Sequence, residues 1–367
     1  MKIAFDGKRF FNNASGLGNY SRDLVRILAE NYPENEYVLL NDKRSDRGTN
    51  VTSLDSVDFR ETSKGIFSRQ LKMGLDAQSI NADIFHGLSG ELPLKWNSRP
   101  IKKVVTIHDL IFLRYPKFYH FFDRKIHLWK FKKACQKADI IIAISQQTKN
   151  DIIEFLKVPE DKIVVVYQGC HQTFKEVKPS DFRATVRSKY KLPQRFILNV
   201  GTIEERKNVL NIVKAITNSD IDLVVVGKKT KYYRSVEKYV LKHKLAERIH
   251  FLEGVTVEEL SALYQMADIF VYPSVFEGFG IPVIEALFSR TPVITSNVSS
   301  LPEAGGSGAL YINPHDVEDL RAKVIALWEN QEERVRRAET GLQYAQKFTD
   351  VVIAENLLSV YQSVINK

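Results

Sequence analysis

Short runs of β-branched and aliphatic residues alternate along the chain with longer segments whose apolar positions recur every three or four residues. Several of the runs are apolar at consecutive positions, which is typical of strands covered by helices on both faces. Helical spacing follows the first run, at Tyr20, Leu24 and Leu28. Regular alternation of strand and helix predicts parallel sheets flanked by helices. The expected strands lie at 2–5, 37–40, 83–86, 103–108, 139–144, 162–167, 195–201, 221–227, 248–252, 268–273, 292–296 and 309–313.

Twelve strands are too many for one small sheet, and 367 residues exceed what a single core usually serves. The series of strands pauses at 171–194, a polar segment that contains Pro179 and Pro193. We therefore predict an α/β protein of two doubly wound Rossmann-like domains, 1–172 and 173–350, that face an interdomain cleft. The amphipathic segment 351–367 can pack on either domain, including back on the first.

The composition is that of an ordinary globular protein, with 44% apolar and 26% charged residues. This excludes disordered, collagen-like and coiled-coil chains. No apolar run reaches the roughly 18 residues that span a bilayer, and the N-terminus turns polar after five residues. We expect a soluble, cytoplasmic protein without a signal peptide. Two cysteines, Cys135 and Cys170, cannot form a disulfide framework or a cysteine-rich zinc site.

The net charge of +9 lies almost entirely in the first half of the chain. Residues 1–175 hold 28 Lys and Arg against 20 Asp and Glu, and the segment 114–137 holds eight basic residues against Asp123 alone. Aromatic residues interleave with these cations, among them Phe121, Phe122 and Trp129. Such a segment can lie on an anionic membrane, follow a nucleic-acid backbone, or form a helix with one solvated face and aromatics in the core.

Doubly wound sheets bind ligands at the carboxyl ends of their strands, so the strand-to-helix loops are the candidate sites. Gly16 and Gly18, in GLGNY at the start of the first predicted helix, can cradle an anion or simply allow tight packing. His108 and Asp109 follow the strand KVVTI. Both can point into the cleft, or His108 can be a buried histidine bonded to backbone and Asp109 the cap of a turn.

The loop GTIEERKN follows the strand FILNV and places Arg206 and Lys207 at the start of the next helix. Cations there oppose the helix dipole unless an anion sits between them. We interpret the pair as a phosphate clamp, with a bidentate Arg and a point-charge Lys. The alternative is that both side chains extend into water.

The loop YPSVFEGFGIPVIEA, 272–286, carries the strongest pattern. Pro282 suits a first helical turn, so a helix should begin near Gly280 and leave backbone amides open to a ligand. Glu277 precedes this helix and Glu285 lies inside it, so that both carboxylates can reach one elongated ligand. If Glu285 is buried it needs a partner, and a bridge between helices is the alternative role.

Amides and cations suited to a diphosphate, with carboxylates suited to hydroxyl groups, indicate a nucleotide-sugar site. On these motifs the chain resembles the glycosyltransferase family 4 enzymes, which have the GT-B fold. The matching segments are GLGNY (16–20), HDL (108–110), SQQTKND (145–151), VGTIEERKN (200–208), ADIFVYPSVFEGFGIPVIEA (267–286) and TPVITSNVSSLPEAGG (291–306). They cover essentially the whole chain.

The resemblance implies retaining transfer of a hexose from a nucleoside-diphosphate sugar to an acceptor hydroxyl, with no cofactor and no bound metal. It implies that Glu285 holds the ribose, that Arg206 and Lys207 hold the diphosphate, and that Glu277 and His108 lie beside the sugar. The remaining donor-binding residues that it implies are Gly16, Gly18, Thr202, Phe279, Gly280 and Ile281. Thr202 stands where many relatives have Arg, and Arg290 where they often have Gly.

The subgroup pattern, FEGFGIP with SSLPE, favours GDP-mannose, with UDP-sugars next, and bacterial surface-polysaccharide assembly. The expected partners are this donor and a glycan or lipid-linked acceptor, with 114–137 docking to a membrane surface. A nucleotide-sugar epimerase of the same fold is the rival enzyme. A nucleic-acid-binding protein is a remote alternative, because no binding-module motif appears, and the glycine spacing disfavours a nicotinamide dehydrogenase.

Overall fold

A computed structural model describes residues 1–14, 16–65 and 68–366 of the chain. It divides into two compact units, of which the first joins Met1–Gln168 to Thr349–Lys367 and the second is Gly169–Phe348. The sequence placed the junction a few residues later, between 172 and 173. Residue 367, the end of the segment 351–367, lies outside the described residues.

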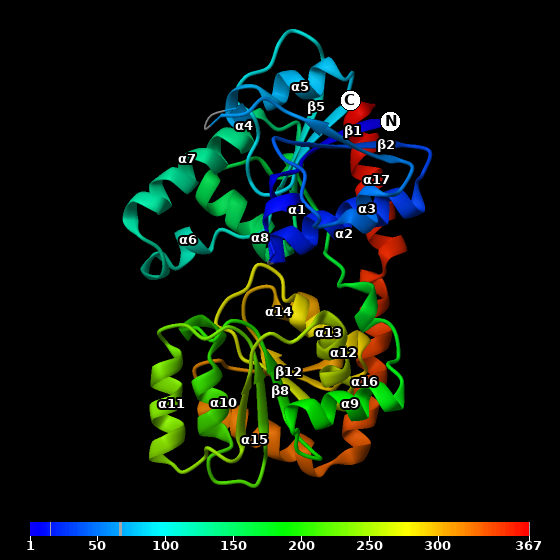
Figure 1. The fold of residues 1–367 in the computed structure, drawn as a ribbon. Coiled ribbons are helices and arrows are strands. Elements are labelled where there is room, and N and C mark those ends of the chain that lie inside the picture. The colour runs from blue at the N-terminus through cyan, green and yellow to red at the C-terminus, as the bar shows by residue number, and fades with distance from the viewer. Residues whose placement is uncertain (15, 66–67, 367) are drawn as a thin grey trace. The chain divides into compact units, whose positions relative to one another are not determined.

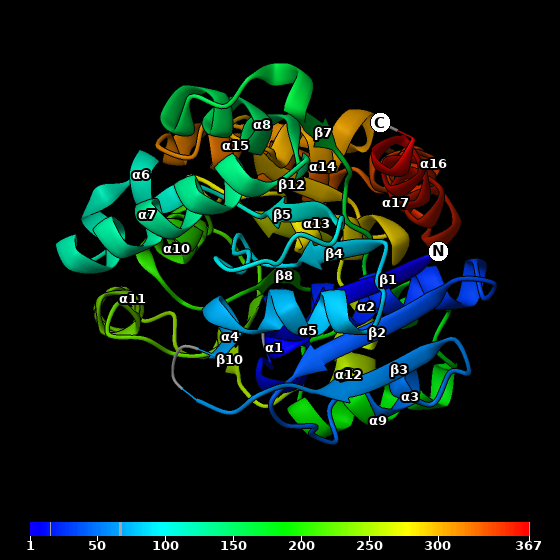
Figure 2. The same ribbon diagram turned by 90° about the horizontal axis from the view of Figure 1, so that it is seen from above.

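The first unit is built on a parallel sheet with the order β3-β2-β1-β4-β5-β6-β7. Figure 2 shows β3, β2, β1, β4 and β5 following one another in this order. The chain reverses its direction of travel across the sheet between β1 and β4, so this unit is doubly wound as predicted. Its strands are β1 (Lys2–Asp6), β2 (Glu36–Asn41), β3 (Val57–Glu61), β4 (Ile84–Gly87), β5 (Lys102–Ile107), β6 (Ile140–Ala143) and β7 (Ile163–Val165).

Two elements of this unit escaped the sequence analysis. The edge strand β3 (VDFRE) buries only Val57 fully, so it shows no apolar run. A five-residue helix, α1 (Lys8–Asn12), follows β1 directly. The prediction that Gly16 opens the first helix is therefore wrong, because Gly16 begins the second helix, α2 (Gly16–Asn31).

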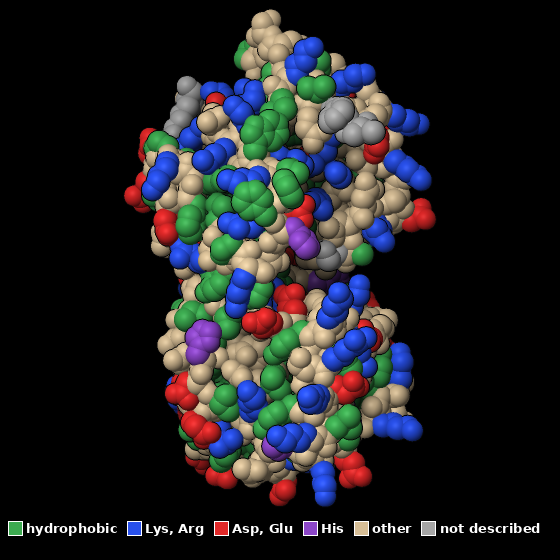
Figure 3. All heavy atoms as spheres, turned by 90° about the vertical axis from the view of Figure 1, so that its left-hand side faces the viewer, with side chains coloured by type: hydrophobic (Ala, Val, Ile, Leu, Met, Phe, Trp, Pro, Cys, Tyr) green, Lys and Arg blue, Asp and Glu red, His purple; other side chains and the backbone are tan. Residues whose placement is uncertain are grey.

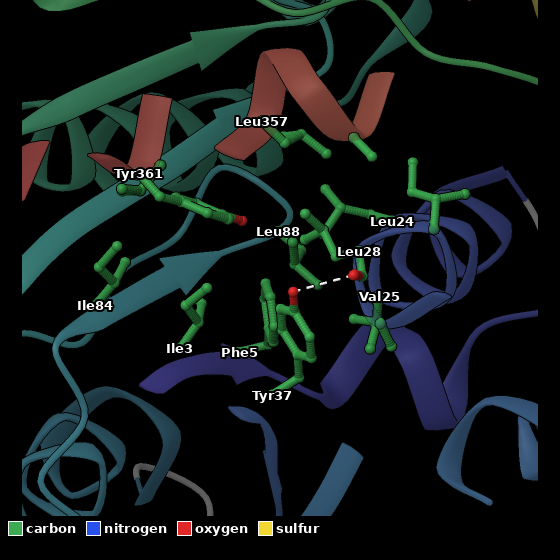
Figure 4. Packing of buried hydrophobic residues seen from close by; sticks show 14 of the residues in the cluster. Ile3, Phe5, Leu24, Val25, Leu28, Tyr37, Ile84, Leu88, Leu357 and Tyr361 are labelled. Atoms are coloured by element: carbon green, nitrogen blue, oxygen red, sulfur yellow. Dashed lines mark hydrogen bonds between the residues drawn. The ribbon is translucent and has the colours of Figure 1, made fainter. Parts of the chain in front are cut away.

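The core of the first unit fills both faces of its sheet. Alternate residues of β1 point to opposite faces, so that Ile3 and Phe5 join one cluster and Ala4 joins the other. The C-terminal helix α17 (Asp350–Ile365) completes the first cluster, with Leu357 and Tyr361 buried against it (Figure 4). It packs beside α2 (Figure 1), and Asp350 forms an ion pair with Arg26 of α2 at 2.9 Å. The other helices of this unit are α3 (Thr49–Thr52), α4 (Ser68–Leu71), α5 (Met73–Ser79), α6 (Ile111–Arg114), α7 (Phe121–Lys137) and α8 (Gln146–Asp151).

The second unit repeats the architecture with a parallel sheet of order β10-β9-β8-β11-β12-β13. Its strands are β8 (Ile197–Val200), β9 (Leu223–Val226), β10 (Ile249–Leu252), β11 (Ile269–Tyr272), β12 (Val293–Ser296) and β13 (Ala309–Ile312). Its helices are α9 (Ser180–Tyr190), α10 (Val209–Ala215), α11 (Tyr233–Lys242), α12 (Val257–Met266), α13 (Ile281–Phe288), α14 (Leu301–Gly305), α15 (Val317–Glu329) and α16 (Gln331–Ala345). The chain changes direction across this sheet between β8 and β11, which places the candidate site at their carboxyl ends.

Candidate active site

The candidate site of the second unit is assembled by the loops that follow β8 and β11. These strands are hydrogen-bonded neighbours, with Ile197 opposite Ile269, so their loops leave the same edge of the sheet side by side. The first loop carries Arg206 and Lys207 on a 3-10 helix, Glu205–Lys207. The loop after β11 lies against it, and the backbone N–H of Val275 donates to the carbonyl of Arg206 at 3.0 Å.

Helix α13 begins at Ile281, with Gly280 as its N-cap and Pro282 in its first turn, as predicted. Gly280 has φ of +125°, a conformation that favours glycine. A β-carbon there would also meet Leu301 at 3.0 Å and Ala304 at 3.2 Å. The backbone can therefore enter the helix by this sharp turn only because residue 280 lacks a side chain.

Ser300 fixes the loop that carries Glu277. Its hydroxyl is buried and donates to the carbonyl oxygens of Glu277 at 2.9 Å and Phe279 at 2.8 Å. The N–H of Glu277 donates to the hydroxyl of Ser299 at 3.1 Å. The backbone on both sides of the glutamate is thus held before any ligand binds.

Arg206 and Lys207 converge on Glu277 and do not extend into water. Arg206 Nη1 lies 2.8 Å and Lys207 Nζ 2.7 Å from Glu277 Oε1, and the three side chains are only 12–18% exposed. Tyr272, the last residue of β11, donates to the same oxygen at 3.0 Å and accepts a hydrogen bond from Lys207. Arg206 also contacts Glu204 at 2.7 Å. Two cations at the start of a helix are unfavourable unless an anion lies between them, and here that anion is Glu277.

The charged groups of this cluster strongly shift one another's pKa values. Burial alone would raise the pKa of Glu277, but the neighbouring charges of Lys207 and Arg206 outweigh it and lower the pKa to about 2. Burial lowers the pKa of Lys207, because Glu277 offsets only part of the desolvation and Arg206 repels the ammonium. Glu277 is therefore a carboxylate at every physiological pH.

Glu285 lies half-buried on α13 and has a partner on the neighbouring helix. The hydroxyl of Tyr264 on α12 donates to Glu285 Oε2 at 2.9 Å. Burial, with the Glu285 charge next, raises the pKa of Tyr264 well above its ordinary value, so the tyrosine stays protonated and donates. The bridge between helices that the sequence left open thus exists.

The remaining residues predicted for this unit lie at the same edge of the sheet. Thr202 is exposed directly after Gly201, whose φ is +140°. Phe279 and Gly280 are buried and Ile281 is half-buried at the start of α13. The sequence analysis missed two tyrosines, Tyr264 and Tyr272, that touch the predicted carboxylates. Both sit in apolar stretches, where an aromatic residue is ordinarily a core residue.

In the first unit His108 follows β5 and is held by backbone, as the alternative role required. Its Nε2 lies 2.9 Å from the carbonyl of Leu88, and its Nδ1 lies 3.3 Å from the side-chain amide of Gln168. Burial lowers the pKa of His108 to about 4 against the opposing bond to Leu88. The neutral ring then donates from Nε2 and accepts at Nδ1. Asp109 accepts from the N–H of Ile111 at 3.1 Å and so caps the following turn.

The two glycines of GLGNY differ in what they require. A β-carbon on Gly18 would lie 1.9 Å from the carbonyl oxygen of Asn13, so only glycine fits there. Gly16 is exposed, and a β-carbon on it would meet nothing within 4 Å. Tight packing therefore explains Gly18 and leaves Gly16 open to a ligand.

Within the described ranges 1–14, 16–65 and 68–366, no three His, Cys, Asp or Glu side chains are grouped as a metal site would require. No helix in that same part of the chain has both the length and the apolar character to cross a bilayer.

Two protein-family models match the chain, one for each half. The model described as Glycosyltransferase Family 4 matches residues 14–173, and the model described as Glycosyl transferases group 1 matches residues 182–344. The O-antigen chain mannosyltransferase B of Escherichia coli is 29% identical over 95% of this chain and 96% of its own length.

Solved structures share the arrangement of both sheets. A glycosyltransferase from Rickettsia africae superposes with a TM-score of 0.78 at 17% identity, over 99% of this chain and 98% of that one. HepE of Anabaena, solved in complex with UDP and glucose, superposes with a TM-score of 0.75 at 16% identity, over 99% and 100% of the two chains. Together with the site, these matches show that the chain belongs to the family 4 glycosyltransferases and has the GT-B fold.

Proposed function

We propose that this glycosyltransferase transfers mannose from GDP-mannose, with retention of configuration, to a hydroxyl of a glycan or lipid-linked acceptor during surface-polysaccharide assembly. The observation that carries the proposal is the Arg206–Lys207–Glu277 cluster at the carboxyl edge of the second sheet. The E. coli relative is named for mannosyl transfer to O-antigen chains, which favours this donor over UDP-sugars. The Anabaena structure contains UDP and glucose, which supports a nucleotide-sugar in general.

The cations of the cluster suit a leaving diphosphate. Lys207 has three N–H donors, of which Tyr272 and Glu277 take two, so a third remains for a phosphate oxygen. Arg206 is held by Glu277, Glu204 and the carbonyl of Phe276 and needs no rearrangement when charge develops. Preorganised positive charge in a dry site stabilises a leaving anion strongly. We propose that it does so here without a metal ion.

The start of α13 and its glutamate suit the two ends of the donor. The N–H groups of Gly280 and Ile281 lie at the N-terminus of the helix, where they have no intrahelical acceptor and favour a sugar hydroxyl or phosphate. Glu285 lies one turn further along. Its carboxylate can accept from both hydroxyls of a ribose in addition to Tyr264, because two oxygens offer about four acceptor positions.

We propose that the acceptor attacks from the face that the phosphate leaves. The acceptor oxygen bonds to the anomeric carbon as the sugar–phosphate bond breaks, and the acceptor proton passes to a phosphate oxygen. Glu277, ion-paired and with a pKa of about 2, is a weak nucleophile and more suited to offsetting positive charge on the sugar. His108, whose two nitrogens are held by Leu88 and Gln168, would pack beside the sugar from the first unit.

A donor screen tests the proposal. GDP-mannose should raise the melting temperature more than GDP-glucose, UDP-glucose or UDP-galactose, because a ligand that binds only the folded state stabilises it. With acceptor present, GDP should be released and the product should carry an α-linked mannose by NMR, at an unchanged rate in EDTA. Donor conversion without acceptor would instead favour the epimerase, and loss of turnover in EDTA that magnesium or manganese restores would refute metal independence.

We further propose that the N-terminal part of α7 docks on an anionic membrane that presents the acceptor. Four large apolar side chains of this helix are 49–77% exposed, namely Phe121, Phe122, Ile126 and Trp129. Leaving so much apolar surface in water is unfavourable and unusual for a helix that faces only solvent. The segment 114–137 also carries eight basic residues, of which Lys125 lies over the ring of Phe121. Figure 3 shows apolar and basic side chains intermixed on the face of the first unit that includes this helix. Aromatic rings with cations beside them favour the interface of an anionic bilayer.

Vesicle sedimentation tests the docking. At low salt the protein should bind phosphatidylglycerol vesicles, and high salt or pure phosphatidylcholine should weaken the binding. The variant Phe121→Ser with Phe122→Ser should lose most of it, whereas Val177→Ser with Leu241→Ser, equally exposed apolar residues of the second unit, should not. Equal binding by both double variants would contradict the proposal.

A further inference from the structure

A continuous chain of uncharged polar side chains crosses the core of the first unit. The hydroxyl of Tyr361 on α17 lies 2.7 Å from Nδ1 of His86 on β4, and His86 Nε2 lies 2.8 Å from the hydroxyl of Thr106 on β5. That hydroxyl lies 3.2 Å from the hydroxyl of Tyr20 on α2. Tyr361, His86 and Thr106 are each 0% exposed.

Each polar group in this hydrogen-bonded chain has a partner because His86 is neutral. Burial, with a smaller effect from His108, lowers the pKa of His86 to about 3. A neutral imidazole donates from one nitrogen and accepts at the other, so it can relay between two hydroxyls along a fixed line. No other uncharged side chain offers one donor and one acceptor at opposite ends of a rigid ring. Apolar replacement of any member would leave a buried polar group unpaired.

The Tyr20 end of this hydrogen-bonded chain contacts His108, which the sequence motifs assign to the active site. The ring of Tyr20 packs edge-on against the ring of His108, with centroids 4.5 Å apart and planes at 90°. Tyr20 also closes the motif GLGNY that carries Gly16 and Gly18. Leu88 and Gln168 hold the two nitrogens of His108, so Tyr20 supplies the contact that fixes the face of its ring.

We infer that His86 is a positioning residue of the transferase: through Thr106 and Tyr20 it sets the His108 ring, and Tyr361 anchors it to α17. The inference rests on the proposed contact of His108 with the sugar. It assigns Tyr361, His86 and Thr106, which are 0% exposed, an indirect part in catalysis through Tyr20 and His108. It also makes helix α17 part of the active site's support.

Substitution of Thr106 tests the inference, because it removes the central link and leaves both histidines in place. Thr106→Val preserves shape and should lower kcat roughly tenfold to a hundredfold, the effect of a small misplacement of a catalytic group. The donor KM should stay within about twofold, since the donor contacts proposed in the second unit are intact. Thr106→Ser keeps the hydroxyl and should restore most of the rate. The imidazole 15N signals of His108 should change in Thr106→Val and return in Thr106→Ser.

A matched control separates positioning from simple loss of stability. Tyr361→Phe removes the anchor of the hydrogen-bonded chain. Tyr37→Phe removes a hydroxyl of the same core cluster, which shares its proton between the carbonyl of Leu28 (Figure 4) and that of Tyr32. Both should lower the melting temperature by similar amounts, but only Tyr361→Phe should lower kcat. Equal kcat in the two variants would overturn the inference.

The variant His108→Ala distinguishes the two possible failures. If His108→Ala retains full kcat, the proposed sugar contact is wrong. If His108→Ala loses rate but Thr106→Val does not, the contact holds and the positioning role of His86 is wrong. If both variants lose rate, the double variant Thr106→Val with His108→Ala should lose little more than His108→Ala alone. The reason is that the hydrogen-bonded chain acts only through the His108 ring.

Discussion

The two units carry similar sheets, but the Arg206–Lys207–Glu277 cluster of the second and the two histidines of the first are held by different means. In the second unit the residues after β8 and β11 are charged, and Arg206, Lys207 and Glu277 neutralise one another. In the first unit the two histidines, His86 on β4 and His108 after β5, are neutral and are linked to hydroxyl, amide and carbonyl groups. A charged cluster can stabilise developing charge, whereas a neutral chain can hold a group in place without adding a field.

The difference follows from what each unit is proposed to meet. A diphosphate brings negative charge, and cations that already have a carboxylate partner can turn a spare donor to it. A sugar brings no charge, and a neutral histidine can pack beside it without adding one. Three predictions test this contrast between a charged and a neutral support, and a fourth tests the turn that positions Glu277 and Glu285.

The largest effect is expected from Lys207→Ala. Loss of one donor to a leaving phosphate should lower kcat by about a hundredfold to a thousandfold, as for other preorganised oxyanion contacts. Steady-state kinetics with saturating donor measures it. Lys189→Ala is the matched control, since Lys189 also pairs with a glutamate, Glu259, beside a tyrosine, Tyr190, in the same unit. A similar loss of rate in both variants would remove Lys207 from the chemistry.

A smaller effect on binding is expected from Glu285→Ala. Loss of a charged acceptor for the ribose should raise the donor KM roughly tenfold to a hundredfold, from about 1.5–3 kcal/mol, with a smaller change in kcat. Tyr264→Phe removes only the bridge to α12 and should destabilise the fold while changing the KM little. If the two variants have the same KM and the same stability, bridging is the whole role of Glu285.

The neutral support should appear in the pH dependence of stability. The folded pKa values of His86 and His108, about 3 and 4, lie below the ordinary 6.5, so the unfolded chain takes up protons first as the pH falls. Stability is therefore full above pH 6.5 and should fall between pH 6.5 and 5 by about 1–2 kcal/mol for each histidine. Urea unfolding at a series of pH values measures this.

At lower pH the same titration also reports on Glu277 of the second unit. Glu277, with a folded pKa of about 2 against 4.5, contributes stability that is present above pH 4.5 and is lost below it. His86→Gln should flatten the curve from about pH 6.5 down to about pH 3, whereas Glu277→Gln should flatten it only below about pH 4.5. A flat curve from pH 7 to 5 in the unaltered protein would show that the two histidines are not held neutral.

The smallest effect is expected from Gly280→Ala, which tests the turn into α13. Its positive φ and the close approach to Leu301 should cost about 1–3 kcal/mol of stability. Gly16→Ala is the control, because a β-carbon there meets nothing within 4 Å. Urea midpoints compare the two, and an equal loss would mean that the turn does not need glycine.

The sequence predicted most of the fold because the buried strands are short apolar runs separated by helical spacing. It failed at β3, whose exposed edge removes the apolar signal, and at α1, which is only five residues long. Twelve of the strands lie where the runs are, since a parallel sheet covered on both faces requires an apolar residue at nearly every position.

The candidate site was predictable where a motif carries it and not where a partner comes from elsewhere in the chain. Pro282 with Gly280 located the start of α13, and the loops of Arg206 and Glu277 were both identified. The ion pair of Lys207 with Glu277 was not foreseen, because 70 residues separate them and only the adjacency of β8 and β11 brings them together. His86 and Tyr361 gave no signal either, since a lone histidine in an apolar strand is ordinarily a core residue.

The return of α17 to the first unit also determines the order in which the molecule can mature. During synthesis Met1–Gln168 leaves the ribosome first, yet the helix that covers Leu24 and pairs with His86 leaves only after the whole second unit. The core of the first unit is thus completed only after the second unit has been synthesised, and until then Nδ1 of His86 lacks its Tyr361 partner. A nascent chain released before residue 349 would have a complete second unit and an incomplete first one.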